Sequence, residues 1–200
     1  MGISDYQKIK KDVEKLHNNY WHYKISNFVC KINDDLIGSE KIRINHGVYF
    51  ETYDYINENQ LFCAELFDGS FVTFTYLFNK KGEIENFSLS FLPNPLSETL
   101  AFKNIDEESN VTSLYFRVDC TEEGHNKLTH SFIHFHNNLF RDGLRIGVKK
   151  ALYPSQFIYD ILINVLGVNE DDLKGLYHQI NCNEELSLIN NDILKMYISF

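Results

Sequence analysis

Two apolar runs on either side of a tight turn constrain the fold more than any other feature of the sequence. Residues 60–67 and 71–78 are rich in aromatic and aliphatic side chains, and Asp68-Gly69-Ser70 separates them. Glycine adopts positive φ without strain, so an Asp-Gly pair between two apolar runs predicts a β-hairpin. A third apolar run, residues 84–92, follows the turn-forming segment 79–82. We therefore predict a three-stranded antiparallel meander over residues 60–92, which Pro93 and Pro95 end because proline cannot donate to a strand ladder.

Helical patterns flank this strand-like middle of the chain. Ser4 is placed to open an N-terminal helix that ends near Trp21, with apolar residues every three or four positions and lysines and acids opposite them. Toward the other end, a proline suited to a first helical turn precedes a helical pattern that ends at Gly167. The C-terminal helices are expected to begin near Pro154, Asn169 and Asn183.

Strands are expected between these helices, and residues 103–110 are polar enough to predict a solvated loop. The expected strands lie near residues 25–32, 47–56, 60–67, 71–78, 84–92, 111–120, 130–137 and 144–149. Helix, then many strands, then helices is the order of an α+β fold rather than of alternating βαβ units. We expect an antiparallel β-sheet of about six to eight strands, with an N-terminal helix and two or three C-terminal helices, in a single domain over residues 1–200.

Composition limits the classes of function. The chain has 19 basic and 28 acidic residues, and its net charge is −9. A broad grip on nucleic acid requires a basic surplus, so contact with a nucleic acid or nucleotide is expected only locally. The four cysteines are far apart and form no C-x-x-C pair. Neither a signal peptide nor an apolar run of about 20 residues is present, so we expect a cytoplasmic protein without a membrane segment.

Histidines gather in one expected strand, residues 130–137. On a strand successive side chains alternate between faces, so His134 and His136 share a face with Cα atoms about 6.5–7 Å apart. That spacing lets two imidazoles converge on one metal ion or one phosphate. His130 has the same parity, but it joins them only if the chain bends.

The neighbouring strands carry matching polar residues. Tyr115, Arg117 and Asp119 alternate with apolar residues, and Arg145 occupies the polar parity of the following strand. If the three strands are neighbours, these residues form one cluster with the histidines. Arginines would bind an anion, with Tyr115 beside them, and histidines would move protons. The candidate catalytic residues are His134, His136, Asp119 and His130, and the candidate substrate-binding residues are Arg117, Arg145 and Tyr115.

Plainer interpretations remain open for this cluster. A sheet face that looks onto water gives the same alternation of polar and apolar residues. A divalent metal is not favoured, because the chain lacks both H-x-H-x-D-H and H-E-x-x-H; its ligands would be His134 and His136, and the cofactor is otherwise unknown. Ser70 lacks a surrounding G-x-S-x-G, so it is assigned to the hairpin. Cys120 has the parity of the core residues, which argues against a cysteine nucleophile.

Three stretches resemble an uncharacterised bacterial family, domain of unknown function 2290, over roughly residues 60–165. The first is Leu66-Phe67-Asp68-Gly69-Ser70 with Tyr76-x-Phe78 and Phe91-Leu92-Pro93-x-Pro95. The second is Tyr115-x-Arg117-x-Asp119 with His130-x-x-x-His134-x-His136 and Arg145. The third is Pro154-Ser155 with Phe157-Ile158. The glycine expected after the second histidine of H-x-H is replaced by Asn137. The resemblance implies an accessory gene product of an anti-phage defence or toxin–antitoxin locus.

Two hypotheses of different class follow, and whether the chain is an enzyme stays open. The first is a hydrolase of a phosphodiester, in RNA or another nucleotide, in which His134 and His136 act as general acid and base or as metal ligands and Asp119 orients a histidine. The alternative is a non-catalytic binding subunit that engages a protein partner from the same locus, for which an exposed apolar patch, or a cluster closed over by the C-terminal helices, is expected. A third hypothesis is that the protein binds a small molecule.

Overall fold

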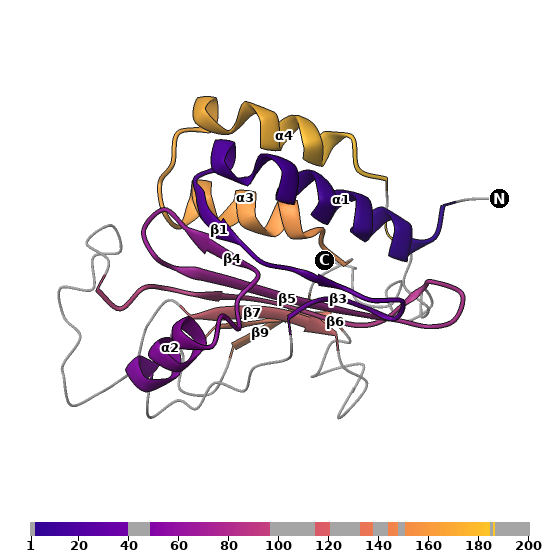
Figure 1. The fold of residues 1–200 in the computed structure, drawn as a ribbon, viewed down its shortest axis with the longest axis horizontal. Coiled ribbons are helices and arrows are strands. Elements are labelled where there is room, and N and C mark those ends of the chain that lie inside the picture. The colour runs from indigo at the N-terminus through magenta and orange to yellow at the C-terminus, as the bar shows by residue number, and fades with distance from the viewer. Residues whose placement is uncertain are drawn as a thin grey trace.

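The computed structural model describes residues 3–39, 49–96, 115–120, 133–137, 144–147, 151–184 and 186, with the backbone alone for 49–50, 133–137 and 144–147. Within these residues a nine-stranded antiparallel sheet is flanked by helices. Helices α1 (Asp5–Asn19), α3 (Pro154–Asn164) and α4 (Lys174–Asn181) lie together over one face of the sheet, whereas α2 (Tyr49–Glu58) lies on the other side (Figure 1). The chain is therefore an α+β protein, as the order of its elements predicted.

The sheet has one long path and two short additions. Its strands are β1 (Ile25–Phe28), β2 (Lys31–Ile32), β3 (Leu36–Gly38), β4 (Ala64–Leu66), β5 (Phe71–Phe78), β6 (Ile84–Leu92), β7 (Phe116–Cys120), β8 (Ile133–Asn137) and β9 (Leu144–Gly147). The path runs β1-β4-β5-β6-β7-β8-β9, while β3 pairs with both β2 and β5. The seven strands of the path agree with the six to eight expected. The short strand β3 was not predicted.

The predicted meander is present, and its first turn is built around a buried serine. Ser70 donates from its backbone nitrogen and its hydroxyl to the Asp68 carboxylate, at 3.0 and 2.8 Å. Asn94, from the segment after β6, donates its backbone nitrogen to Ser70 Oγ at 2.9 Å and its side-chain amide to the Asp68 carbonyl at 2.8 Å. The turn and the Pro93-x-Pro95 segment are thus one hydrogen-bonded unit, and Ser70 is structural.

The main core lies between the sheet and the helical layer. The stripe of α1 consists of Ile9, Val13 and Leu16, all at most 1% exposed, and it packs in the same cluster as Phe74 of β5. The phenyl rings of Phe116 in β7 and Phe157 in α3 meet edge to face with centroids 5.8 Å apart. Alternate residues of the long strands therefore face these helices, which leaves the intervening residues on the opposite face.

One acid in the helical layer departs from the expected pattern. Asp12 is fully buried, although lysines and acids were expected on the outer face of the first helix. Its carboxylate accepts hydrogen bonds from the backbone nitrogen and hydroxyl of Ser155 at 3.0 and 2.6 Å, from Gln179 at 2.9 Å and from Asn183 at 2.9 Å. These four residues, the Asp12 cluster, join α1 to the first turn of α3, to α4 and to the segment after it.

The strand predicted at residues 47–56 is wrong, because residues 49–58 form helix α2. In a helix Tyr53 and Ile56, three residues apart, face the same way. Both pack with Phe71 in a second, smaller core, and the rings of Tyr53 and Phe71 stack with centroids 4.7 Å apart. Tyr55, which a strand would have placed beside Tyr53, is 58% exposed. Packing against the back of the sheet thus selects the helix.

The remaining sequence predictions fall partly inside the described residues. The N-terminal helix begins after Ser4 as predicted and passes into a 3-10 turn, Tyr20–Tyr23. The helix from Pro154 and the turn capped by Asn169 are confirmed. The loop at 103–110 and the helix expected after Asn183 lie outside the described residues. All four cysteines are free thiols, and none of the described helices is long and apolar enough to cross a membrane.

Candidate functional site

Strand pairing brings the predicted polar residues into register. β7 pairs with β8, and β8 pairs with β9, which is the arrangement that a single cluster required. Directly opposed residues of an antiparallel sheet lie on the same face, and neighbouring strands are about 4.8 Å apart. One row of opposed residues is Ser90, Arg117, His136 and Arg145. The next row is Ser88, Asp119, His134 and Gly147.

Both rows continue onto β5, where Thr73 is opposed to Ser90 and Thr75 to Ser88. The five-strand surface so formed, from Thr73 and Thr75 to Arg145, is called the polar face below. It lies opposite the face that packs on α1 and α3, because its residues alternate with Phe74, Leu89 and Val118 of the main core. α3 and α4, the C-terminal helices that the structure describes, therefore do not cover it (Figure 1).

Most of the described side chains of the polar face are buried, although Thr75 and Arg117 are partly exposed. Thr73, Ser88 and Ser90 are 7–8% exposed, and Asp119 is 3% exposed. Buried polar groups cost free energy unless they are hydrogen-bonded or paired. The sequence left open that polar and apolar residues alternate on β5, β6 and β7 only because one face of the sheet is in contact with water. The burial of these polar side chains argues against that explanation.

Arg117 and Asp119 form an ion pair between Nε and Oδ2. Two residues apart on one strand, they share a face, and the pair holds the guanidinium against the sheet. The predicted role of Asp119 in orienting a histidine stays a prediction, because only the backbone of β8 is described. Tyr115, which precedes β7, is 6% exposed, and Ser90 and Arg117 lie close enough to influence the pKa of its hydroxyl. Burial raises the pKa of Tyr115, while the charge of Arg117 acts in the opposite direction.

Three of the predicted site residues are placed by their side chains and three by backbone register alone. Arg117 and Asp119 are in contact, and Tyr115 adjoins Arg117. His134, His136 and Arg145 occupy neighbouring register positions. His130 lies outside the described residues. Cys120 is 1% exposed in the main core, as its parity predicted.

Sequence reasoning missed the hydroxyl groups that extend the polar face. The signal was present, since Thr73 and Thr75 alternate with aromatic residues and Ser88 and Ser90 flank Leu89. These segments were recognised as strands, but their polar residues were not connected to the Arg117 strand. The pairing of β6 with β7 makes that connection, and it crosses the long segment between them.

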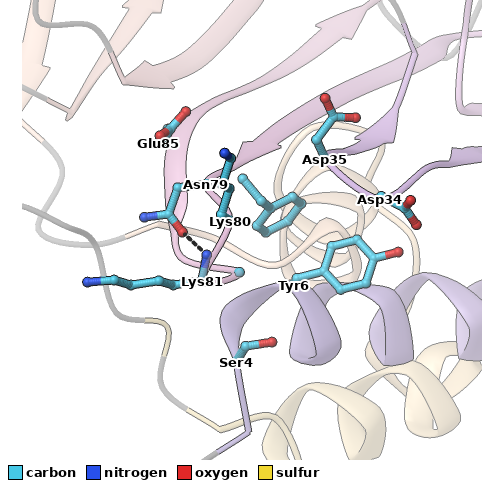
Figure 2. A pocket seen from close by; sticks show the side chains of 10 residues that line it. Ser4, Tyr6, Asp34, Asp35, Asn79, Lys80, Lys81 and Glu85 are labelled. Carbon is cyan, nitrogen blue, oxygen red and sulfur yellow. Dashed lines mark hydrogen bonds between the residues drawn. The ribbon is translucent and has the colours of Figure 1, made fainter.

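A sizeable cavity of the described residues lies away from the polar face. Its volume is about 640 Å³, and it is bounded by the turn between β5 and β6, the start of α1 and the turn before β3 (Figure 2). Lysines and acids face it from different elements: Lys80 and Lys81 from one turn, Asp34 and Asp35 from another, and Glu85 from β6. None of the predicted site residues lines it. Among the described side chains no group of three or more histidine, cysteine or acidic residues is arranged to hold a metal ion.

Fold and site together define an α+β protein with three of the described helices on one face of an antiparallel sheet, and with helix α2 and a mostly buried polar face on the other. A sequence model of the family described as Uncharacterized conserved protein (DUF2290) matches residues 18–192. The chain belongs to this family, which confirms the resemblance in its motifs. No curated protein and no solved structure shows significant similarity to the chain.

Proposed function

We propose that the protein is a hydrolase of phosphodiesters, with RNA or another nucleotide as its substrate and the polar face as its site. The observation that carries the proposal is the row in which Arg117, His136 and Arg145 are opposed on three adjacent strands. Two arginines on either side of a histidine, with steps of about 4.8 Å between strands, suit a phosphate group and its proton transfers.

The roles follow from the chemistry of each side chain. Arg117 and Arg145 bind the phosphate, and the ion pair with Asp119 holds the Arg117 guanidinium in place. His134 and His136 act as general acid and base, because histidine titrates near neutral pH. A divalent metal held by His134 and His136 would polarise a phosphoryl oxygen and supply a hydroxide nucleophile. By the family resemblance, the activity belongs to anti-phage defence or to a toxin–antitoxin pair.

A double substitution tests this proposal. The full chain is incubated with bis(p-nitrophenyl) phosphate and with fluorescent single-stranded RNA, each with Mn²⁺, with Mg²⁺ and with EDTA. Loss of general acid–base catalysis costs about 10²–10⁴-fold in rate, so His134→Ala with His136→Ala should lower hydrolysis at least 100-fold. His22→Ala, at an exposed histidine of the helical layer, is the matched control. If the double variant hydrolyses either substrate as fast as the control does, the proposal is wrong.

The burial of the polar face supports a second function. Asp119 and Ser88 are at most 7% exposed, and in this second function they stabilise the sheet rather than contact a substrate. The protein would then be a non-catalytic subunit that binds a protein encoded beside it. Co-expression with each neighbouring gene product, followed by size-exclusion chromatography, distinguishes the two functions. A stable complex formed equally by the wild type and the double histidine variant, without hydrolysis by either, favours the binding subunit.

A further inference from the structure

A groove outside the polar face exposes one of the four thiols. It lies between α1 and the strands β1 and β2, and its volume is about 440 Å³. Its lining combines apolar Val13, Phe28 and Ile32 with His17, Glu14 and Cys30. Such a mixture admits a small, partly apolar molecule to the sulfur of Cys30.

A second thiol, that of Cys63, lies on the segment that pairs with the residues just before Cys30. The backbone oxygen of Cys63 accepts a hydrogen bond from Val29 at 2.8 Å, and Phe28 is paired with Ala64. These contacts hold the segment of Cys30 against the segment of Cys63, and each thiol is close enough to shift the pKa of the other. Cys63 is fully buried, and its thiol also donates to the carbonyl of Phe74 at 3.4 Å. One thiol of the pair is therefore reachable, and the other is reachable only through the first.

The surroundings of Cys30 set how readily it reacts. Its interaction with the Cys63 thiol and its burial raise the pKa of the Cys30 thiol, and the backbone of Gly38 opposes this rise only in part. The thiolate is the nucleophilic form, so oxidation at neutral pH is slow. A slow reaction suits a thiol pair that reacts once and is later reduced, rather than a site that turns over a substrate.

We propose that Cys30 and Cys63 form a thiol oxidation site, at which a small hydroperoxide entering the groove converts the pair into an intramolecular disulfide. In the first step the sulfur of Cys30 attacks the peroxide, an S–O bond forms, the O–O bond breaks and an alcohol or water leaves. In the second step the sulfur of Cys63 attacks the resulting sulfenic acid and expels water. Two thiols and one hydroperoxide thus give one disulfide, one alcohol or water, and one further water.

The disulfide would join the connection between β1 and β2 to the segment before β4. A covalent link across a loop of roughly 30 residues restricts the unfolded chain more than the folded one. The oxidised protein should therefore unfold at a higher temperature than the reduced protein, by on the order of 5–10 °C for a chain of this size. This inference is independent of the function proposed for the polar face.

Thiol mapping on the full chain tests the proposal. Reduced protein carrying Cys182→Ser, which removes the exposed cysteine, is treated with hydrogen peroxide or with cumene hydroperoxide. The remaining thiols are then alkylated and the protein is digested without reductant. A peptide that links Cys30 to Cys63, with both thiols lost at the same rate, is expected from at least one oxidant. A disulfide-dependent rise in Tm that dithiothreitol reverses is expected in parallel.

Two single variants resolve the order of the steps. Cys63→Ser should stop the reaction at a Cys30 sulfenic acid that dimedone captures. Cys30→Ser should leave Cys63 reduced, because Cys63 has no exposed surface. The proposal is overturned if both thiols of the Cys182→Ser protein remain alkylatable under oxidant that fully oxidises Cys182 in the wild type. It is also overturned if Cys30 is joined to another cysteine, or if Cys63 is oxidised equally fast without Cys30.

Discussion

Replacement of Asp12 by asparagine should destabilise the protein severely, although the two side chains have nearly the same shape. The best placement of the amide keeps its oxygen at the position of Oδ1, where it still accepts from Ser155 Oγ, Gln179 and Asn183. The amide NH₂ then faces the backbone N–H of Ser155, which donates to Oδ2 in the wild type. Two donors oppose each other there, and a buried donor without an acceptor costs about 1–3 kcal/mol.

The lost charge adds to this cost. Hydrogen bonds to a charged group are worth about 1.5–3 kcal/mol each, against about 0.5–1.5 kcal/mol for neutral ones, and three such bonds are weakened. Relief from burying a charge offsets part of that loss. We therefore expect Asp12→Asn to lower the free energy of unfolding by about 2–4 kcal/mol, which is a fall in Tm of about 6–12 °C near the middle of that range.

Urea unfolding followed by circular dichroism measures this change, with the midpoint and the slope fitted separately. Asp54→Asn, at an exposed acid on α2, is the matched control and should stay within about 0.5 kcal/mol of the wild type. A double-mutant cycle of Asp12→Ala with Gln179→Ala should show a coupling of about 1–2 kcal/mol, because the two side chains are in direct contact. If Asp12→Asn is no more harmful than Asp54→Asn, the carboxylate does not hold the helical layer together.

Two further predictions concern the sheet and the back of it. Gly38→Ala should lower the free energy of unfolding by about 3–5 kcal/mol, because φ is +125° and a Cβ would lie 1.9 Å from the Phe74 carbonyl oxygen. Gly167→Ala is the control: its φ is +64° with nothing within 4 Å, so the same urea titration should show a loss of only about 1 kcal/mol. Burial raises the pKa of Tyr53 to about 12, with Glu65, Asp68 and Asp54 adding to the effect. Because the folded phenol keeps its proton above the ordinary value of 10.0, its contribution to stability is complete below that pH and is lost as the pH rises toward about 12. Tyr53→Phe should flatten the fall of the free energy of unfolding above about pH 10, and an unchanged slope would contradict this assignment.

The sequence predicted those elements whose conformation depends on the residues of a single turn. The Asp68-Gly69 turn gave the hairpin because positive φ at Gly69 is a local requirement. Pro154 gave the start of α3 for a similar reason, since its fixed φ suits a first helical turn. The polar rows were predicted in part, because alternation along a strand states which residues share a face. Which strands are neighbours follows from no local rule, and the pairing of β6 with β7 had to come from the structure.

Tertiary contacts explain the errors. Residues 47–56 alternate aromatic or aliphatic with polar residues, which predicted a strand, but residues 49–58 form a helix whose Tyr53 and Ile56 pack on the back of the sheet. Asp12 was assigned to an outer face, yet it lies three residues after Ile9 and four before Leu16, on the buried stripe itself. An acid within an apolar stripe could have predicted that Asp12 is buried. Its partners could not be predicted, because Ser155, Gln179 and Asn183 are far along the chain.

The Asp12 cluster has a consequence for how the protein folds during its synthesis on the ribosome. Hydrogen bonds of the Asp12 carboxylate span 143 residues to Ser155, 167 to Gln179 and 171 to Asn183. Helix α1 thus leaves the exit tunnel before the sheet and carries an acid whose partners are synthesised more than 140 residues later. Until those partners are made, the carboxylate stays in water, which keeps α1 away from the sheet. Closure of the helical layer is therefore a late event, and a chain arrested before Gln179 would display its nascent sheet to chaperones and proteases instead of covering it.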